Sequence, residues 1–238
     1  MGSGIAHVFA LKGFEVTLVE AKKELADKAL AVIAKNLDRQ VAKGAVTAAD
    51  KDAALSRIKP ALSPKEAPGF QFAVEAVSER MELKTSVFRE LDAAAAPGAI
   101  LATNTSSLSV TEIAASVKDP SRVIGMHFMN PVPVMKLVEI IRGLQTSDET
   151  YQVTRELSLK LGKTPAAAKD FPGFISNRVL MPMINEAIYC LMEGVSTKED
   201  IDTVMKLGMA HPMGPLQLAD YIGLDVCLAV MEVLHQGF

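Results

Sequence analysis

The amino-acid sequence predicts an α/β protein, in which a doubly wound parallel sheet is followed by a smaller all-helical domain. Through residues 1–170, short apolar stretches of strand length alternate with amphipathic stretches of helical length, and this alternation is typical of βαβ units. Residues 171–238 continue the helical pattern without a strand-like stretch. We therefore expect two domains with these bounds.

Composition excludes several classes of protein. The chain has 238 residues, of which 49% are hydrophobic and 22% charged, with a net charge of -3. A nucleic-acid-binding domain would be basic, and no apolar run reaches the roughly 20 residues that span a bilayer. No signal peptide is recognisable, and no Cys/His cluster has the spacing of a metal site. Cys190 and Cys227 lie in apolar helical patterns and are interpreted as buried free thiols. We expect a cytoplasmic, metal-free protein.

The first elements are a helix and a strand. The spacing of apolar residues predicts a helix over residues 1–11, and Phe14–Glu20 alternates before it closes on an acid, as a strand does. In a dinucleotide-binding fingerprint, glycines at a strand-to-helix turn let the backbone approach a pyrophosphate, and an acid about 20 residues later accepts ribose hydroxyls. A helix followed by a strand that ends in Glu is the second half of such a unit.

Gly2 and Glu20 fit two positions of that fingerprint, because they lie 18 residues apart. We interpret Gly2 as its last glycine and expect the first strand of a Rossmann-like sheet to be missing, with roughly a dozen residues lost at the start of the chain. The end of the chain is also expected to be incomplete, because it stops in a helical run. The alternative is a helix-start glycine and a surface acid. An acid at this position favours NAD over NADP, whose 2'-phosphate it would repel.

A helical hairpin is expected next. Ala21–Lys43 has apolar residues at helical spacing, and Thr47–Arg57 begins with a capping-box pattern in which Asp replaces the usual Glu or Gln. Lys35, Arg39 and Lys43 are four residues apart and form one basic stripe on the first helix. The stripe is either a solvated face or a handle for phosphate groups.

Three more strands are expected, with helices between and after them. The strands are Phe70–Val77, Ile100–Thr103 and Val123–Met129, and the helices are Met81–Ala95, Ser109–Val117 and Thr146–Lys163. Ligands of doubly wound sheets bind beyond the carboxyl ends of the strands. The residues that end or follow a predicted strand there are Glu20, Glu79, Asn104 and His127. We expect this edge of the sheet to carry the site.

The helical domain begins after a loop at Lys169–Gly173. Its expected helices are Phe174–Glu193 with a kink at Pro182, Thr197–Leu207 behind a capping box of Ser196 and Glu199, and Pro215–Leu234.

His127 and Glu139 are the candidates for acid–base chemistry. His127 is the one histidine of four at a predicted strand end next to a turn, and a histidine held by a carboxylate is a general base that works near neutral pH. Glu139 follows in the apolar run L-V-E-I-I, where a buried acid needs a partner. The alternatives are a hydrogen-bonded structural histidine and a solvent-facing glutamate.

One long run carries a family resemblance. Asn104 opens N-T-S-S-L-S-V, and M-H-F-M-N-P-V-P-V-M-K-L-V-E ends at Glu139. On this run the whole chain resembles the L-3-hydroxyacyl-CoA dehydrogenases, most closely their bacterial 3-hydroxybutyryl-CoA branch. The resemblance implies an NAD-dependent oxidoreductase that interconverts (S)-3-hydroxyacyl-CoA, with 3-hydroxybutyryl-CoA expected, and 3-ketoacyl-CoA. It also implies a homodimer formed through the C-terminal helical domain.

The resemblance implies roles in substrate binding and catalysis. His127 is the base and is held by Glu139, while Ser106 hydrogen-bonds the substrate near the reacting carbon. Asn177, from the second domain, also holds the substrate, and Lys43 binds the phosphates of coenzyme A. Without the resemblance, Ser106 and Asn177 could equally be helix-capping residues.

The resemblance also implies how NAD is bound. Gly2 and Glu20 belong to the dinucleotide fingerprint, and Glu79, Lys84 and Asn104 match positions that line the nicotinamide half. Each of the last three could instead be an ordinary helix-start or surface residue.

Two other functions stay open at this point. The chain could be a related dehydrogenase of a non-CoA hydroxy acid, in which case the basic stripe would not serve coenzyme A. It could also be a non-catalytic fragment or structural homologue, which the missing glycines favour and the set of His127, Glu139, Ser106 and Asn177 opposes.

Overall fold

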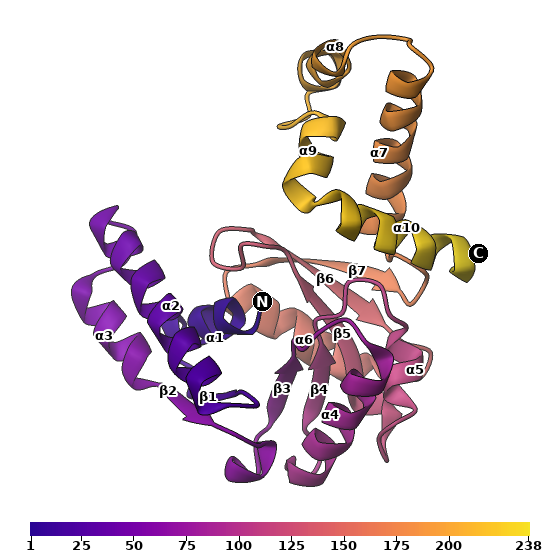
Figure 1. Cartoon of the computed structure of the whole chain (residues 1–238). Coiled ribbons are helices and arrows are strands. Elements are labelled where there is room, and N and C mark those ends of the chain that lie inside the picture. The colour runs from indigo at the N-terminus through magenta and orange to yellow at the C-terminus, as the bar shows by residue number, and fades with distance from the viewer. The chain divides into compact units, whose positions relative to one another are not determined.

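The computed structural model describes all residues, 1–238, which form two compact units (Figure 1). Unit 1 contains residues 1–105 and 109–170, and unit 2 contains residues 106–108 and 171–238. None of the helices combines the length and the apolar character needed to cross a lipid bilayer.

Unit 1 is built on two sheets. Strands β1 and β2 form a parallel pair, and the other five strands form a sheet in the order β3-β4-β5-β6-β7. Within the larger sheet, β3, β4 and β5 are parallel, β6 is antiparallel to β5, and β7 is parallel to β6. The strands are β1 Val16–Val19, β2 Ile58–Ala61, β3 Phe72–Glu75, β4 Ile100–Thr103, β5 Val123–Phe128, β6 Leu137–Arg142 and β7 Thr164–Lys169.

Strands β2, β6 and β7 were not predicted from the sequence, and β6 also departs from the expected all-parallel sheet. Strand β2 contains Pro60, a residue normally confined to edge strands, and β2 pairs with β1 alone. Strand β7 reads T-P-A-A-A-K and lacks the β-branched and aromatic residues that mark strands. Strand β6 runs antiparallel because the connection over residues 129–136 is too short for a helical crossover.

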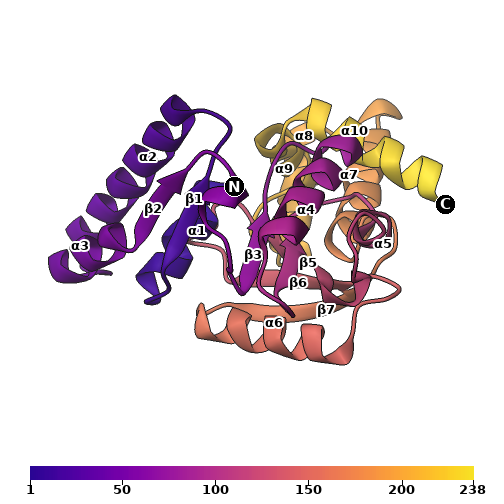
Figure 2. The ribbon, with the colours of Figure 1, turned by 90° about the horizontal axis from the view of Figure 1, so that it is seen from below.

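The helices of unit 1 cover both faces of the five-stranded sheet. Figure 2 shows α4 and α5 on one side of this sheet and α6 on the other. The helices are α1 Gly2–Leu11, α2 Lys23–Ala42, α3 Ala48–Ser56, α4 Met81–Ala94, α5 Val110–Ala114 and α6 Asp148–Lys160, with 3-10 turns η1 Pro64–Glu66 and η2 Pro120–Arg122. Both halves of the expected capping box at Thr47 and Asp50 are present.

Helix α1 packs against both sheets. Ile5 and Val8 belong to the apolar core of the five-stranded sheet, whereas Ala6 and Ala10 pack in a second core with β1, β2, α2 and α3. A Cβ atom on Gly4 would lie 3.0 Å from Val132 Cβ, so the close approach there requires a small residue. Helix α1 therefore joins the two halves of unit 1.

His7 lies on this helix with 1% of its surface exposed. Its Nε2 is 3.2 Å from Gln40 Oε1. Burial lowers the pKa of His7 below its usual 6.5, the hydrogen bond to Gln40 opposes that shift, and the positive charge of Lys163 adds to it. His7 is therefore neutral in the folded protein at neutral pH.

The stability of unit 1 should depend on the titration of His7. As the pH falls below 6.5, His7 becomes protonated in the unfolded chain but stays neutral in the folded protein. The free energy of unfolding therefore falls, by at most about 1.4 kcal/mol per pH unit. Urea unfolding of His7→Gln between neutral pH and pH ~5 should show a weaker dependence than the parent chain. His235→Gln, at an exposed position, should keep the parent's dependence. Equal pH dependence in His7→Gln and the parent would contradict this account.

Unit 2 is helical, and its elements correct two sequence predictions. Helix α8 is capped by the Thr197 side chain, which accepts from the Asp200 N–H, so the predicted Ser196/Glu199 capping box is wrong. The single last helix is divided at Gly223, whose φ is 102°. The elements are α7 Ser176–Met192, which contains Pro182, α8 Lys198–Thr203, the π-helical turn η3 Val204–Gly208, α9 Pro215–Ile222 and α10 Leu224–Gly237.

The core of unit 2 joins α7, α9 and α10. It is formed by Met181, Ile184, Ala219, Cys227, Val230 and Leu234. Both cysteines are free thiols, but only Cys227 is buried, whereas Cys190 is half-buried.

Candidate active site

The carboxyl ends of the parallel strands bring polar residues to one edge of the five-stranded sheet. Glu75 at the end of β3 pairs with Thr103 at the end of β4, and Thr103 pairs with Gly125 of β5. Because β6 is antiparallel, it starts at the same edge, where His127 stands directly opposite Glu139.

His127 and Glu139 form a buried pair. The His127 Nδ1 and Glu139 Oε2 atoms are 3.0 Å apart, and the residues are 8% and 2% exposed. An ionised carboxylate only accepts hydrogen bonds, so Nδ1 is the donor and Nε2 carries the lone pair. The structure therefore excludes a solvent-facing Glu139 and gives the imidazole one defined basic nitrogen.

Asn104 fixes the backbone beside this pair. Its Oδ1 accepts a hydrogen bond of 2.9 Å from the backbone N–H of Phe128, the residue after His127. The Asn104 backbone N–H donates in turn to the Glu75 carbonyl. Asn104 therefore connects the ends of β3, β4 and β5, and its side-chain NH₂ group provides further donors for a ligand.

A buried ion pair, which the sequence did not predict, lies at the end of β3. Lys84 Nζ is 2.9 Å from Glu75 Oε1, and the two side chains are 1% and 0% exposed. Glu75 also accepts hydrogen bonds from the Thr103 hydroxyl and the Val77 N–H. The acid at the end of β3 and the lysine nine residues later are the sequence signal for this pair.

Glu79 is the more accessible member of the same network. Its Oε2 lies 3.3 Å from Lys84 Nζ, and 34% of its side chain is exposed, while its Oε1 accepts from the Thr105 hydroxyl. Glu79 and Lys84 were both expected at the nicotinamide, together with Asn104. Glu79 is partly exposed and can meet a ligand, whereas Lys84 is buried behind it.

Gly2 and Glu20 fit a dinucleotide. Gly2 opens α1, whose first turn has neither a side-chain cap nor an acid, so the start of the helix suits a pyrophosphate. A Cβ atom on Gly2 would lie 3.9 Å from Ala76 Cβ, which places the start of α1 beside the end of β3. Glu20 directly follows β1, where a carboxylate can accept ribose hydroxyls.

The remaining expected residues are Ser106, Asn177 and Lys43. Asn177 Nδ2 donates a 2.9 Å hydrogen bond to the Ser106 carbonyl, so unit 2 brings together two residues that are 71 positions apart. Lys43 caps the end of α2. It is exposed and belongs to the helical hairpin rather than to the sheet edge.

Comparison with known proteins decides the family. Residues 1–171 match the family model for the 3-hydroxyacyl-CoA dehydrogenase NAD binding domain, and residues 173–238 match the model for the C-terminal domain of the same family. The chain belongs to the 3-hydroxyacyl-CoA dehydrogenase family. The NAD-dependent oxidoreductase class, the NAD cofactor and the Rossmann-like fold expected from the sequence are thereby confirmed.

Individual members of the family are similar along the whole chain. The probable 3-hydroxybutyryl-CoA dehydrogenase of Bacillus subtilis is 55% identical over 237 residues, which are 100% of this chain and 83% of that protein. The 3-hydroxybutyryl-CoA dehydrogenase of Bradyrhizobium diazoefficiens is 52% identical, with 100% and 81% covered. The crystal structure of (S)-3-hydroxybutyryl-CoA dehydrogenase PaaH1 from Ralstonia eutropha matches with a TM-score of 0.97 at 48% identity, covering 100% of this chain and 84% of that one.

Proposed function

We propose that this 3-hydroxyacyl-CoA dehydrogenase acts on a short-chain substrate and interconverts (S)-3-hydroxybutyryl-CoA and acetoacetyl-CoA. The observation that carries the proposal is the buried His127–Glu139 pair at the ligand-binding edge of the sheet. The similarity to 3-hydroxybutyryl-CoA dehydrogenases supports the short acyl chain.

His127 performs the acid–base step. In the oxidation, Nε2 accepts the proton of the 3-hydroxyl group as the hydride leaves C3, and the C3–O bond becomes a carbonyl. When bound, NAD supplies the hydride acceptor. Glu139 accepts from Nδ1 throughout and stabilises the imidazolium that forms. In the reduction, the imidazolium returns its proton to the 3-oxygen.

The sheet edge and the start of α1 hold the cofactor. We assign Gly2 to the pyrophosphate, Glu20 to the adenosine ribose, and Glu79 and Asn104 to the nicotinamide half. Lys84 acts through Glu79, whose carboxylate it holds. The uncapped first turn of α1 and the partial exposure of Glu79 support these roles.

Ser106, Asn177 and Lys43 bind the substrate. The Ser106 hydroxyl and the Asn177 amide hold the 3-oxygen and its neighbours, which favours charge that develops there. The contact between Asn177 and Ser106 supports a joint role. Lys43 is exposed and binds a phosphate of coenzyme A.

Unit 2 forms a homodimer in this proposal. Its helices expose several large apolar side chains, whereas monomers rarely leave contiguous apolar patches exposed. These residues are Val179, Leu207, Met209, Tyr221, Leu224 and Leu228. The free thiols of Cys190 and Cys227 support a reducing compartment, the cytoplasm.

The test is the oxidation of NADH by the purified chain in the presence of acetoacetyl-CoA. We expect oxidation that depends on acetoacetyl-CoA, with a rate at least about tenfold lower for NADPH because Glu20 repels the 2'-phosphate. Acetoacetate without coenzyme A is the matched substrate control. Equal rates with acetoacetate would favour a dehydrogenase of a non-CoA acid, and no oxidation with either substrate would overturn the proposed function.

A further inference from the structure

A hollow between α1, the end of α2 and the segments that precede β6 and β7 is lined by positively charged side chains and by no acidic one. Its volume is about 290 Å³, and its charged or titratable lining residues are His7, Lys12, Lys136 and Lys163. The remaining lining residues are apolar or uncharged, and none is an Asp or a Glu. None of the three lysines takes part in an ion pair. Three cations therefore meet here without a counter-charge.

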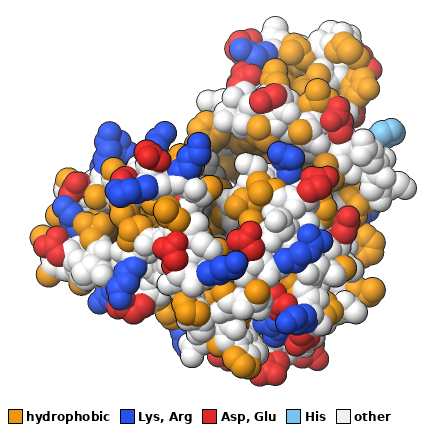
Figure 3. All heavy atoms as spheres, turned by 60° about the horizontal axis from the view of Figure 1, so that its bottom comes forward, with side chains coloured by type: hydrophobic (Ala, Val, Ile, Leu, Met, Phe, Trp, Pro, Cys, Tyr) orange, Lys and Arg blue, Asp and Glu red, His pale blue; other side chains and the backbone are white.

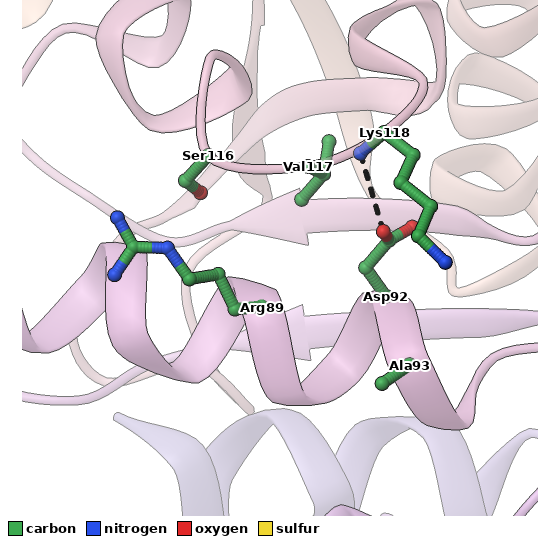
Figure 4. Close-up of a pocket in the computed structure, with 6 residues that line it drawn as sticks. All are labelled: Arg89, Asp92, Ala93, Ser116, Val117 and Lys118. Carbon is green, nitrogen blue, oxygen red and sulfur yellow. Dashed lines mark hydrogen bonds between the residues drawn. The ribbon is translucent and has the colours of Figure 1, made fainter.

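A second hollow, of about 340 Å³, is lined by both basic and acidic side chains (Figure 4). It is lined by Arg89, Lys118 and Asp92 among others. Asp92 accepts a hydrogen bond from the Lys118 backbone N–H and forms an ion pair with Arg122. Acidic and basic side chains are likewise interspersed over the molecular face drawn in Figure 3. The concentration of positive charge in the first hollow is thus a local feature and not a property of the whole surface.

Lys163 is the fixed cation of the first hollow. Its side chain is buried, and Nζ donates to the carbonyls of Val132 at 2.5 Å and Met135 at 2.7 Å. An ammonium group has three N–H donors, so one remains for a ligand. Burial lowers the pKa of Lys163, and the charge of Lys12 lowers it further. An anion in the hollow would oppose this lowering of the pKa of Lys163, because it favours the charged ammonium group.

Lys12 lies close to this group. A Cβ atom built on Gly162, the residue before Lys163, would be 3.7 Å from Lys12 Nζ. Lys136 belongs to the connection that precedes β6. Lys12 and Lys136 are both exposed, so their ammonium groups can move onto a ligand without disturbing the core.

His7 contributes a buried nitrogen. Its Nε2 donates to Gln40, and its Nδ1 has no hydrogen-bond partner. A buried polar atom without a partner is costly. Protonation would add an N–H donor at Nδ1, and a bound anion would favour that protonated form. The charged groups that line the hollow with it are Lys12, Lys136 and Lys163.

We propose that the hollow formed by Lys12, Lys136, Lys163 and His7 binds a phosphate group. A phosphate monoester or inorganic phosphate carries about -1.5 to -2 at pH 7, which matches several cations better than a carboxylate does. Lysine ammonium groups are common phosphate ligands. The volume of about 290 Å³ exceeds the roughly 30 Å³ of one water several times, so a phosphate fits with its hydration. The inference does not depend on the proposed reaction.

The test uses inorganic phosphate and the full chain. Isothermal titration calorimetry would compare the parent with a Lys12→Gln/Lys136→Gln double variant, which leaves Lys163 in place. The matched control is Lys28→Gln/Lys65→Gln, which removes the same charge at exposed positions outside the hollow. We expect the dissociation constant for phosphate to rise by about tenfold or more in the double variant and by less than about twofold in the control.

A second readout follows His7. In an NMR pH titration, saturating phosphate should raise the pKa of His7, whose signals are identified by their loss in His7→Gln. If coenzyme A displaces inorganic phosphate from the parent, the phosphate group comes from the substrate. If coenzyme A and inorganic phosphate bind at the same time, the hollow binds a free phosphate ion. Either result supports the proposal. Absence of phosphate binding to the parent, equal affinity in the double variant, or an equal loss in the control would overturn it.

Discussion

His127→Gln is expected to lower kcat for acetoacetyl-CoA reduction by about 10²- to 10⁴-fold, the usual contribution of a general acid–base group. The glutamine amide can still donate a hydrogen bond to Glu139, so the buried carboxylate keeps a partner. It cannot carry a proton to or from the 3-oxygen. Steady-state kinetics at saturating NADH would measure the loss, and circular dichroism would show that the fold is retained.

Two variants serve as controls for that result. His235→Gln replaces an exposed histidine and should keep the parent's kcat. Glu139→Gln should reduce kcat less than His127→Gln, because the base is still present although Glu139 no longer stabilises the imidazolium. Unchanged turnover in folded His127→Gln would mean that another group is the base.

Lys84→Met is expected to be the most destabilising single substitution at the site, costing about 3–5 kcal/mol. It leaves the Glu75 carboxylate, which is 0% exposed, buried without its cation. The remaining hydrogen bonds from Thr103 and Val77 stabilise a carboxylate only in part. Since domains are stable by about 5–15 kcal/mol, urea unfolding should show a large drop in the midpoint.

The double variant Glu75→Leu/Lys84→Met tests whether the unpaired Glu75 carboxylate causes the loss of stability. Replacing both partners removes the uncompensated charge, so the double variant should be more stable than Lys84→Met alone. Lys65→Met, at an exposed position, should change the free energy of unfolding by less than about 0.5 kcal/mol. If Lys84→Met were as stable as the parent, the Glu75–Lys84 ion pair would not contribute to the free energy of unfolding.

The elements that were predicted well are those whose signals are local. The apolar run of β5 and the reciprocal hydrogen bonds of Thr47 and Asp50 depend on neighbours in sequence. Pro60 hid β2, because whether a proline is tolerated depends on the strand's place at an edge. The division at Gly223 depends on a left-handed backbone that the continuous apolar pattern of α9 and α10 does not reveal.

At the site, polar residues at strand ends were predictable as a group, because parallel strands finish at one edge. Their individual partners were not. Glu75 lies inside the expected strand Phe70–Val77, where an acid suggests a solvent-facing position, and only the packing of α4 on β3 buries it beside Lys84. Lys12, Lys136 and Lys163 come from segments far apart in sequence, so no sequence motif predicts that they line one hollow.

The antiparallel register of β5 and β6 decides whether the proposed acid–base pair can form. His127 meets Glu139 only because these residues face each other in the ladder. A shift of this register by one residue would turn Glu139 to the opposite side of the sheet from His127. Surface connections usually tolerate changes in length. Here a change in the length of residues 129–136 would be tolerated only as long as the register, which the buried faces of β5 and β6 hold, stays unchanged.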